Sequence, residues 1–91
     1  MDRVERRVSV ERARVDERLL FQVTIEGFDP ILLPTHWLGH LFGVLFGSDA
    51  SFVFRDALDG RMPIIYARPW LDEAQLAALE AMLAVYRREA A

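Results

Sequence analysis

Residues 19–26, LLFQVTIE, decide the fold because their side chains alternate between the two sides of an extended chain. The odd-numbered positions are all large and apolar, whereas the even-numbered positions are polar except for Leu20. A period of two is typical of a β-strand with one buried face. The segment therefore predicts a strand whose odd-numbered side chains enter a core.

The segment before it predicts a partner strand. Residues 7–15 mix valine with charged residues, which would also suit a helix, but the β-branched valines favour a strand. Asp16-Glu17 lies between the two segments and predicts a hairpin turn. Residues 1–6 are the part of the chain in which we expect disorder.

The segment after it predicts a turn and then a helix. Residues 27–30, GFDP, have turn composition. Residues 35–46 predict a helix with Thr35 as its N-cap, and Gly47 is a residue typical of the position just past a helix end.

A second hairpin is predicted from residues 51–57 and 62–67. Asp59-Gly60 between them is a strong hairpin-turn signal. Pro63 has no backbone N–H to donate, so it places the return strand at an edge of the sheet or near its own start.

The last helix is predicted from Asp72 onward, because Gln75 three residues later completes a capping box. The element order is then ββαββα in one domain spanning residues 1–91. We expect an α+β fold in which two helices cover one face of an antiparallel four-stranded sheet as a two-layer sandwich.

Composition excludes several classes of protein. The chain has 91 residues, of which 53% are hydrophobic and 27% charged, and a formal charge of −3, which together indicate a small folded domain. Cysteine is absent, which excludes disulfides, thiolate nucleophiles and cysteine-based metal sites. Lysine is also absent, which excludes lysine-based catalysis, and the use of arginine alone indicates a GC-rich bacterial genome.

The same composition predicts a cytoplasmic protein. The charged first residues are not followed by the apolar stretch of a secretory signal. The most apolar segment, residues 31–47, is interrupted by Pro34, His36 and His40 and is shorter than the ~20 residues of a membrane span.

The predicted central helix has no charged side chain between His36 and Gly47. On a helical wheel, one arc carries only histidine and glycine, and large apolar residues fill the rest. Such a helix needs cover on all sides, which either its own sheet and C-terminal helix or a second molecule would supply. In the second case the interface residues are Trp37, Gly39, Leu41, Phe42, Gly43 and Phe46. The alanine-rich side of the last helix is a further candidate contact surface, although alanine is also simply the best helix former.

His36 and His40 are the only histidines, and their i, i+4 spacing allows both to bind one metal ion. Further ligands would have to be Asp49 or Asp56, or come from a second chain. Local hydrogen bonding of the two imidazoles is the simpler alternative. Ser48 beside Asp49 is typical of a turn, and we assign no catalytic residues.

The remaining features refine the choice of partner. The arginines of residues 3–18 alternate with acidic residues, which argues against nucleic acid as a partner. Trp70 is expected to fill the junction between sheet and last helix.

The leading hypothesis is a non-enzymatic protein-interaction or assembly module that forms a homodimer through its central helix. The alternatives are a metal- or small-ligand-binding protein using His36 and His40, or a small acidic inhibitor of the immunity-protein type; no cofactor is expected.

Overall fold

The computed structural model describes residues 3–59 and 64–90. Its elements, in chain order, are β1 (Val4–Glu5), β2 (Val8–Val15), β3 (Arg18–Ile25), β4 (Ile31–Leu33), α1 (Thr35–Phe46), the 3₁₀ turn η1 (Gly47–Asp49), α2 (Ala50–Asp59), β5 (Ile64–Ala67), β6 (Trp70–Leu71) and α3 (Glu73–Ala90). The α+β class is therefore confirmed, but the predicted order ββαββα is not.

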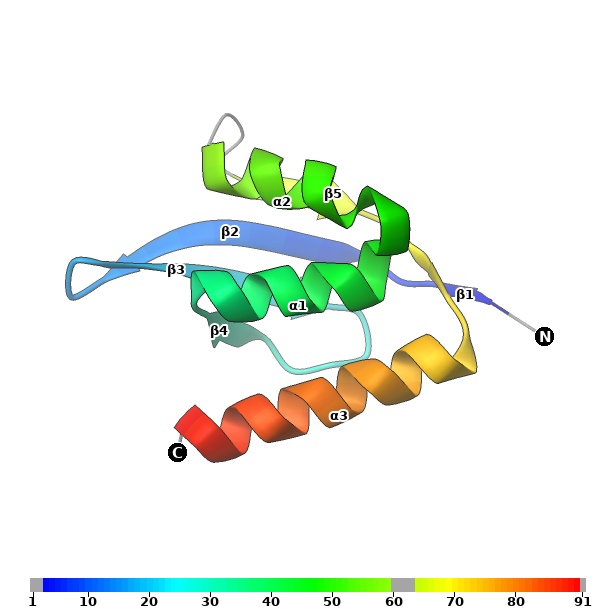
Figure 1. The fold of residues 1–91 in the computed structure, drawn as a ribbon. Helices are drawn as coiled ribbons and strands as arrows, with labels where there is room; N and C mark the ends of the chain where they lie inside the picture. The colour runs from blue at the N-terminus through cyan, green and yellow to red at the C-terminus, as the bar shows by residue number, and fades with distance from the viewer. Residues whose placement is uncertain (1–2, 60–63, 91) are drawn as a thin grey trace.

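The strands form one sheet of order β4-β3-β2-β5, with all neighbours antiparallel, and a separate pair, β1 with β6. In the central register, Val10 lies opposite Val23, and Val23 lies opposite Ile31. The β2–β3 hairpin extends beyond the N-terminal end of α1 (Figure 1). Its turn, Asp16-Glu17, is as predicted, and both residues have positive φ angles, of 51° and 67°.

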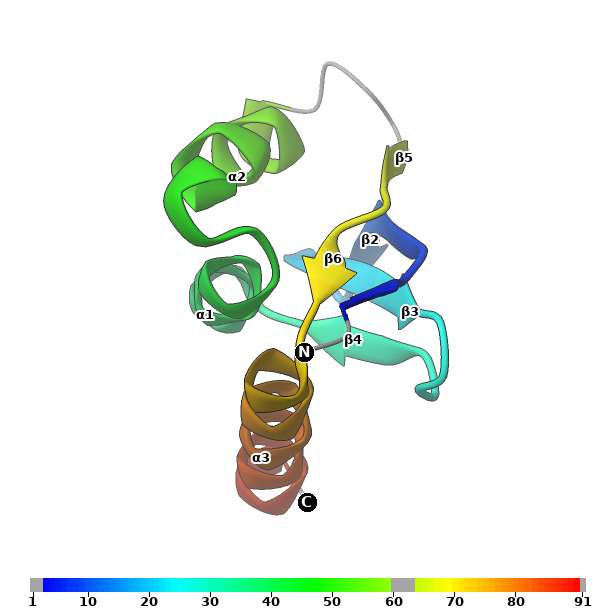
Figure 2. The ribbon, with the colours of Figure 1, turned by 90° about the vertical axis from the view of Figure 1, so that its right-hand side faces the viewer.

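The helices lie on one side of this sheet. Figure 2 shows α1 beside the sheet, with α2 above it and α3 below it. The odd-numbered side chains Phe21, Val23 and Ile25 of β3 are buried, and Leu19 is partly buried, as the alternation of residues 19–26 predicts. Buried hydrophobic side chains of the core are Val8, Val10, Phe21, Val23, Ile25, Ile31, Leu33, Leu38, Leu41, Phe42, Leu45, Leu71, Leu79 and Leu83.

The predicted strand at residues 51–57 is wrong, because these residues belong to helix α2. In a strand, Phe52 and Phe54 would share one face. In the helix they separate: Val53 and Phe54 pack against the core cluster, whereas Phe52 is 65% exposed. The i, i+3, i+4 spacing of Ala50, Val53 and Phe54 is the helical signal that the β-propensity of the segment obscured.

The second hairpin is correspondingly different. Its return strand exists as β5, but β5 pairs with β2 rather than with residues 51–57. Residues 60–63, which include Gly60 of the predicted turn and Pro63, lie outside the described residues, whereas Asp59 is the last residue of α2. The sheet instead gains β4, a three-residue strand too short to show a period in the sequence.

The N-terminus also departs from expectation, since Val4 and Glu5 form β1 rather than a disordered segment. The Arg6 backbone N–H donates a hydrogen bond to the carbonyl of Pro69 at 3.1 Å. The chain before β2 is therefore tied to the chain before α3.

Helix boundaries were largely predictable. Gly47 ends α1 with a φ of 57°, but the N-cap is Pro34, and Thr35 is the first helical residue. At α3, the Asp72 carboxylate accepts a hydrogen bond from the Gln75 N–H at 2.8 Å, and the Gln75 amide oxygen accepts one from the Asp72 N–H at 3.1 Å. These bonds form the predicted capping box.

The junction between sheet and α3 is filled by Leu71, not by Trp70 as predicted. Leu71 is fully buried, whereas Trp70 is 57% exposed. Consecutive residues of a strand point to opposite faces, so only one of the two can enter the core.

Candidate functional site

Helix α1 is held on three sides by the rest of the chain. One side faces the sheet through Leu38, Leu41 and Leu45, which are essentially inaccessible to solvent. On the side toward α3, the Trp37 ring meets the Tyr86 ring edge-to-face with centroids 5.3 Å apart. The Gln75 side-chain amide of α3 also donates a hydrogen bond to the carbonyl of α1 residue Val44 at 3.2 Å.

The third side faces α2. A Cβ placed on Gly39 would lie 3.6 Å from the Phe54 ring, which is ordinary van der Waals contact. The rings of Phe42 and Phe54 meet with centroids 6.3 Å apart. The chain therefore reverses direction at Gly47, so that α2 packs beside α1.

The fourth side of α1 is open to solvent. It carries His36, His40, Gly43 and Gly47, all of which are exposed, and we call these four residues the α1 arc. Among residues 3–59 and 64–90, a Cβ placed on Gly43 would meet nothing within 4 Å. The alternative in which the C-terminal helix covers this arc is wrong, because Trp37 and Val44 make the contacts with α3.

The predicted interface residues divide between the core and the surface. Leu41 and Phe42 are fully buried within the single chain, so they are not accessible to a partner. Gly39 faces α2, and Trp37 and Phe46 are half-buried. Of the predicted set, only Gly43 is exposed on the open side.

The exposed side of α3 lies next to the α1 arc. Leu79 and Leu83 enter the core, and Gln75 and Tyr86 contact α1 or the carbonyl of β4 residue Leu32. At 100° per residue, the next side around the helix turns to solvent beside α1. That side carries exposed alanines, which we call the small-residue face of α3: Ala74, Ala78 and Ala81.

The two histidines project from successive turns of the α1 arc. Their ring centroids lie 6.1 Å (His36) and 5.8 Å (His40) from that of Trp37, which therefore borders both imidazoles. Among the described residues of one chain, no group of three or more metal-ligating side chains comes together. Asp49 and Asp56, the candidate further ligands, are exposed in η1 and α2 and do not complete a site within the chain.

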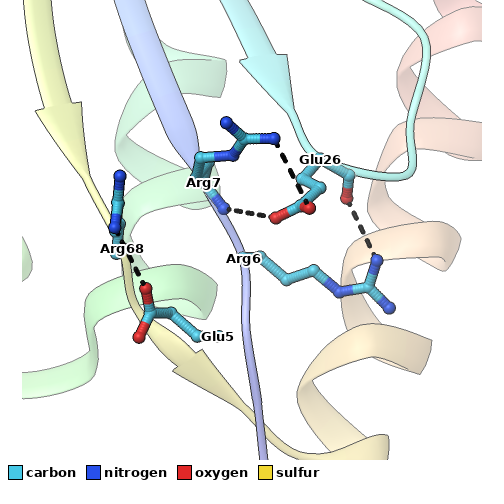
Figure 3. A network of polar contacts seen from close by, with 5 residues as sticks. All are labelled: Glu5, Arg6, Arg7, Glu26 and Arg68. Carbon is cyan, nitrogen blue, oxygen red and sulfur yellow. Dashed lines mark hydrogen bonds and ion pairs between the residues drawn. The ribbon is translucent and has the colours of Figure 1, made fainter.

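Arg6 and Arg7, together with Arg68, make polar contacts at the end of β3 and at β1 (Figure 3). Arg7 pairs with Glu26 at 3.8 Å and donates its backbone N–H to the same carboxylate at 3.1 Å. Arg68 pairs with Glu5 at 3.7 Å, and Arg6 donates to the carbonyl of Glu26 at 3.3 Å. Exposed pairs like these add little stability, and they neutralise the charge of Arg7 and Arg68.

Gly27 makes this arrangement possible. Its φ of +91° suits glycine, and a Cβ there would lie 2.7 Å from a guanidinium nitrogen of Arg6. The polar cluster is therefore a structural tie between the N-terminus and the end of β3.

One segment, Thr35–Asp56, is long and apolar enough to cross a membrane by length and composition alone. It extends past residues 31–47, the stretch judged too short from the sequence. In the structure it is not one continuous helix, because η1 separates α1 from α2 and Phe54 packs back beside Gly39.

Comparisons with family models, curated proteins and solved structures give no match, so the function has to be inferred from the geometry.

Proposed function

We propose that this protein is a small non-enzymatic assembly module that forms a homodimer through the α1 arc and the small-residue face of α3. The observation that carries the proposal is Gly43, an interior helix residue whose side-chain direction meets no atom within 4 Å in the described part of the chain.

Glycine in a helix interior costs about 1 kcal/mol relative to alanine. Nothing within the described chain requires that cost at Gly43, since a Cβ there would have open space. A closely approaching helix from a second molecule would offset it, because glycine lets two backbones come nearer than any other residue allows.

A second copy of the chain is the occupant that the charges favour. From His36 to Gly47 the helix has no charged side chain, and the neighbouring face of α3 carries Ala74, Ala78 and Ala81 before the charged Glu89 in its last turn. Two copies related by a twofold axis would place largely uncharged surfaces against each other with little like-charge repulsion. A strongly charged partner would gain nothing from this face.

The size of the face predicts a weak dimer. Helix α1 has 12 residues, so it is about 18 Å long, and with the width of two helices the face covers roughly 400 Å² in projection. Two such faces together give roughly 800 Å², which is below the ~1,000 Å² or more that specific, stable interfaces bury from both partners together. We therefore expect a dissociation constant in the micromolar range.

Light scattering coupled to size exclusion tests the proposal with matched variants. Gly43→Arg places a bulky charge on the α1 arc, and Thr24→Arg places the same charge at an exposed position of β3. We expect the first variant to be monomeric and the second to dimerise like the wild-type chain. Equal dimerisation of both variants would overturn the proposed interface.

The proposal includes a cytoplasmic location, in line with an apolar segment that folds back on itself within the chain. Recovery of the full chain in the membrane fraction after cell lysis would contradict that location.

A further inference from the structure

We propose that His36 and His40 of two copies form a zinc site on the twofold axis of the dimer. This inference rests on the proposed function, because one chain supplies only half of the ligands.

The geometry within one chain supplies two ligands to one point. Residues i and i+4 on a helix lie one turn apart on the same face, with Cβ atoms about 6 Å apart. Both imidazoles are exposed on the α1 arc. Such a pair can bind one metal ion through one nitrogen of each ring.

Two ligands alone do not make a closed site, since zinc in proteins takes four ligands in a tetrahedron. No third ligand joins the histidines among the described residues of one chain. A second copy related by a twofold axis through the α1 arc would contribute its own His36 and His40 and complete the four. The small residues beside them, Gly43 and Gly47, leave room for the second helix to approach.

The donor chemistry selects the metal class. Imidazole nitrogen suits Zn²⁺, Cu²⁺ and Ni²⁺, whereas Mg²⁺ and Ca²⁺ require oxygen ligands. The α1 arc carries no carboxylate. Magnesium is therefore the matched negative control.

Trp37 orients the two imidazoles. Its ring lies next to both histidine rings and is itself held by the edge-to-face contact with Tyr86. An apolar group on that side limits the rotation of each imidazole and excludes water from one flank of the site. The same proximity gives a spectroscopic readout, since metal binding beside Trp37 should change its fluorescence.

The experiment measures dimerisation and Trp37 emission of a tag-free chain on titration with Zn²⁺ alone and with Mg²⁺ alone. A Trp70→Phe background removes the other tryptophan. We expect one zinc per two chains, and a dimer dissociation constant lowered on the order of 100-fold when free zinc is ~100 times its own dissociation constant. His36→Ala and His40→Gln, both at exposed positions, should each abolish the zinc response and leave the fold intact.

The possible outcomes separate the two proposals. A wild-type dimer that neither binds zinc nor tightens in its presence would overturn the zinc site and leave the proposed function standing. A chain that stays monomeric with and without zinc would overturn both. One zinc bound per chain without dimerisation, or an equal response to magnesium, would overturn the bridging site.

Discussion

Replacing Gly43 with alanine should stabilise the single chain and weaken the dimer. The new Cβ would meet nothing within 4 Å among the residues that the structure describes, so the substitution brings no steric cost there. The helix gains the propensity difference between glycine and alanine, about 1 kcal/mol. For a domain of this size, that gain raises the melting temperature by roughly 4–8 °C. In the dimer the same methyl group would stand between two closely packed helices.

Gly39→Ala is the matched control on the same helix. Its Cβ would lie 3.6–3.7 Å from the Phe54 ring, an ordinary contact within the chain, so it should bring a similar gain. Because Gly39 faces α2 and not the open side, the control should leave dimerisation unchanged.

The assay combines two measurements on each variant. Urea unfolding followed by circular dichroism at ~1 µM, where a weak dimer is dissociated, reports the stability of the single chain. Sedimentation velocity at higher concentration reports the dimer. If Gly43→Ala gains no stability, the open environment assigned to it is wrong. If it gains stability and dimerises as well as the Gly39→Ala variant, the close helix contact is wrong.

Other substitutions test the fold. Asp16→Asn combined with Glu17→Gly should raise the free energy of unfolding by about 1 kcal/mol, because both positions have positive φ and Asn-Gly suits such a turn; an unchanged urea midpoint would count against the turn geometry. Gln75→Ala should lower the free energy of unfolding by about 2 kcal/mol, because this one side chain both caps α3 and donates a hydrogen bond to α1. A loss below ~0.5 kcal/mol would show that the two hydrogen bonds are not formed together. Tyr86→Phe should cost about 1 kcal/mol through the 2.8 Å hydrogen bond to the Leu32 carbonyl, measured by the same unfolding assay, and a neutral effect would exclude that bond.

Local patterns predicted the parts of the fold that depend on neighbouring residues. The alternation of residues 19–26 identified β3 and its buried face, and the spacing of Asp72 and Gln75 identified the start of α3. Each signal is complete within a few residues, so no knowledge of distant contacts is needed.

The secondary-structure predictions were wrong where contacts between residues far apart in the sequence determine the structure. Residues 51–57 have high β-propensity, but packing against α1 stabilises a helix there. Strand β4 has three residues and is specified by its pairing with β3, which its own sequence does not reveal.

Only part of the candidate site could be predicted from the sequence, for a related reason. A helical wheel groups His36, His40 and Gly43 on one arc, and the structure keeps them on one side. The wheel does not say which side the sheet covers, so it could not tell that Leu41 and Phe42 are buried in the chain's own core. The positions of α2 and α3 relative to α1 supply that information.

Sedimentation equilibrium of the untagged wild-type chain, from ~1 µM to ~500 µM, tests the central claim most directly, because a micromolar dissociation constant lies within that range. The account predicts that the weight-average mass rises with concentration from the 10.5 kDa of one chain toward twice that value. A mass that stays at one chain throughout would contradict it and leave the α1 arc an ordinary solvated surface.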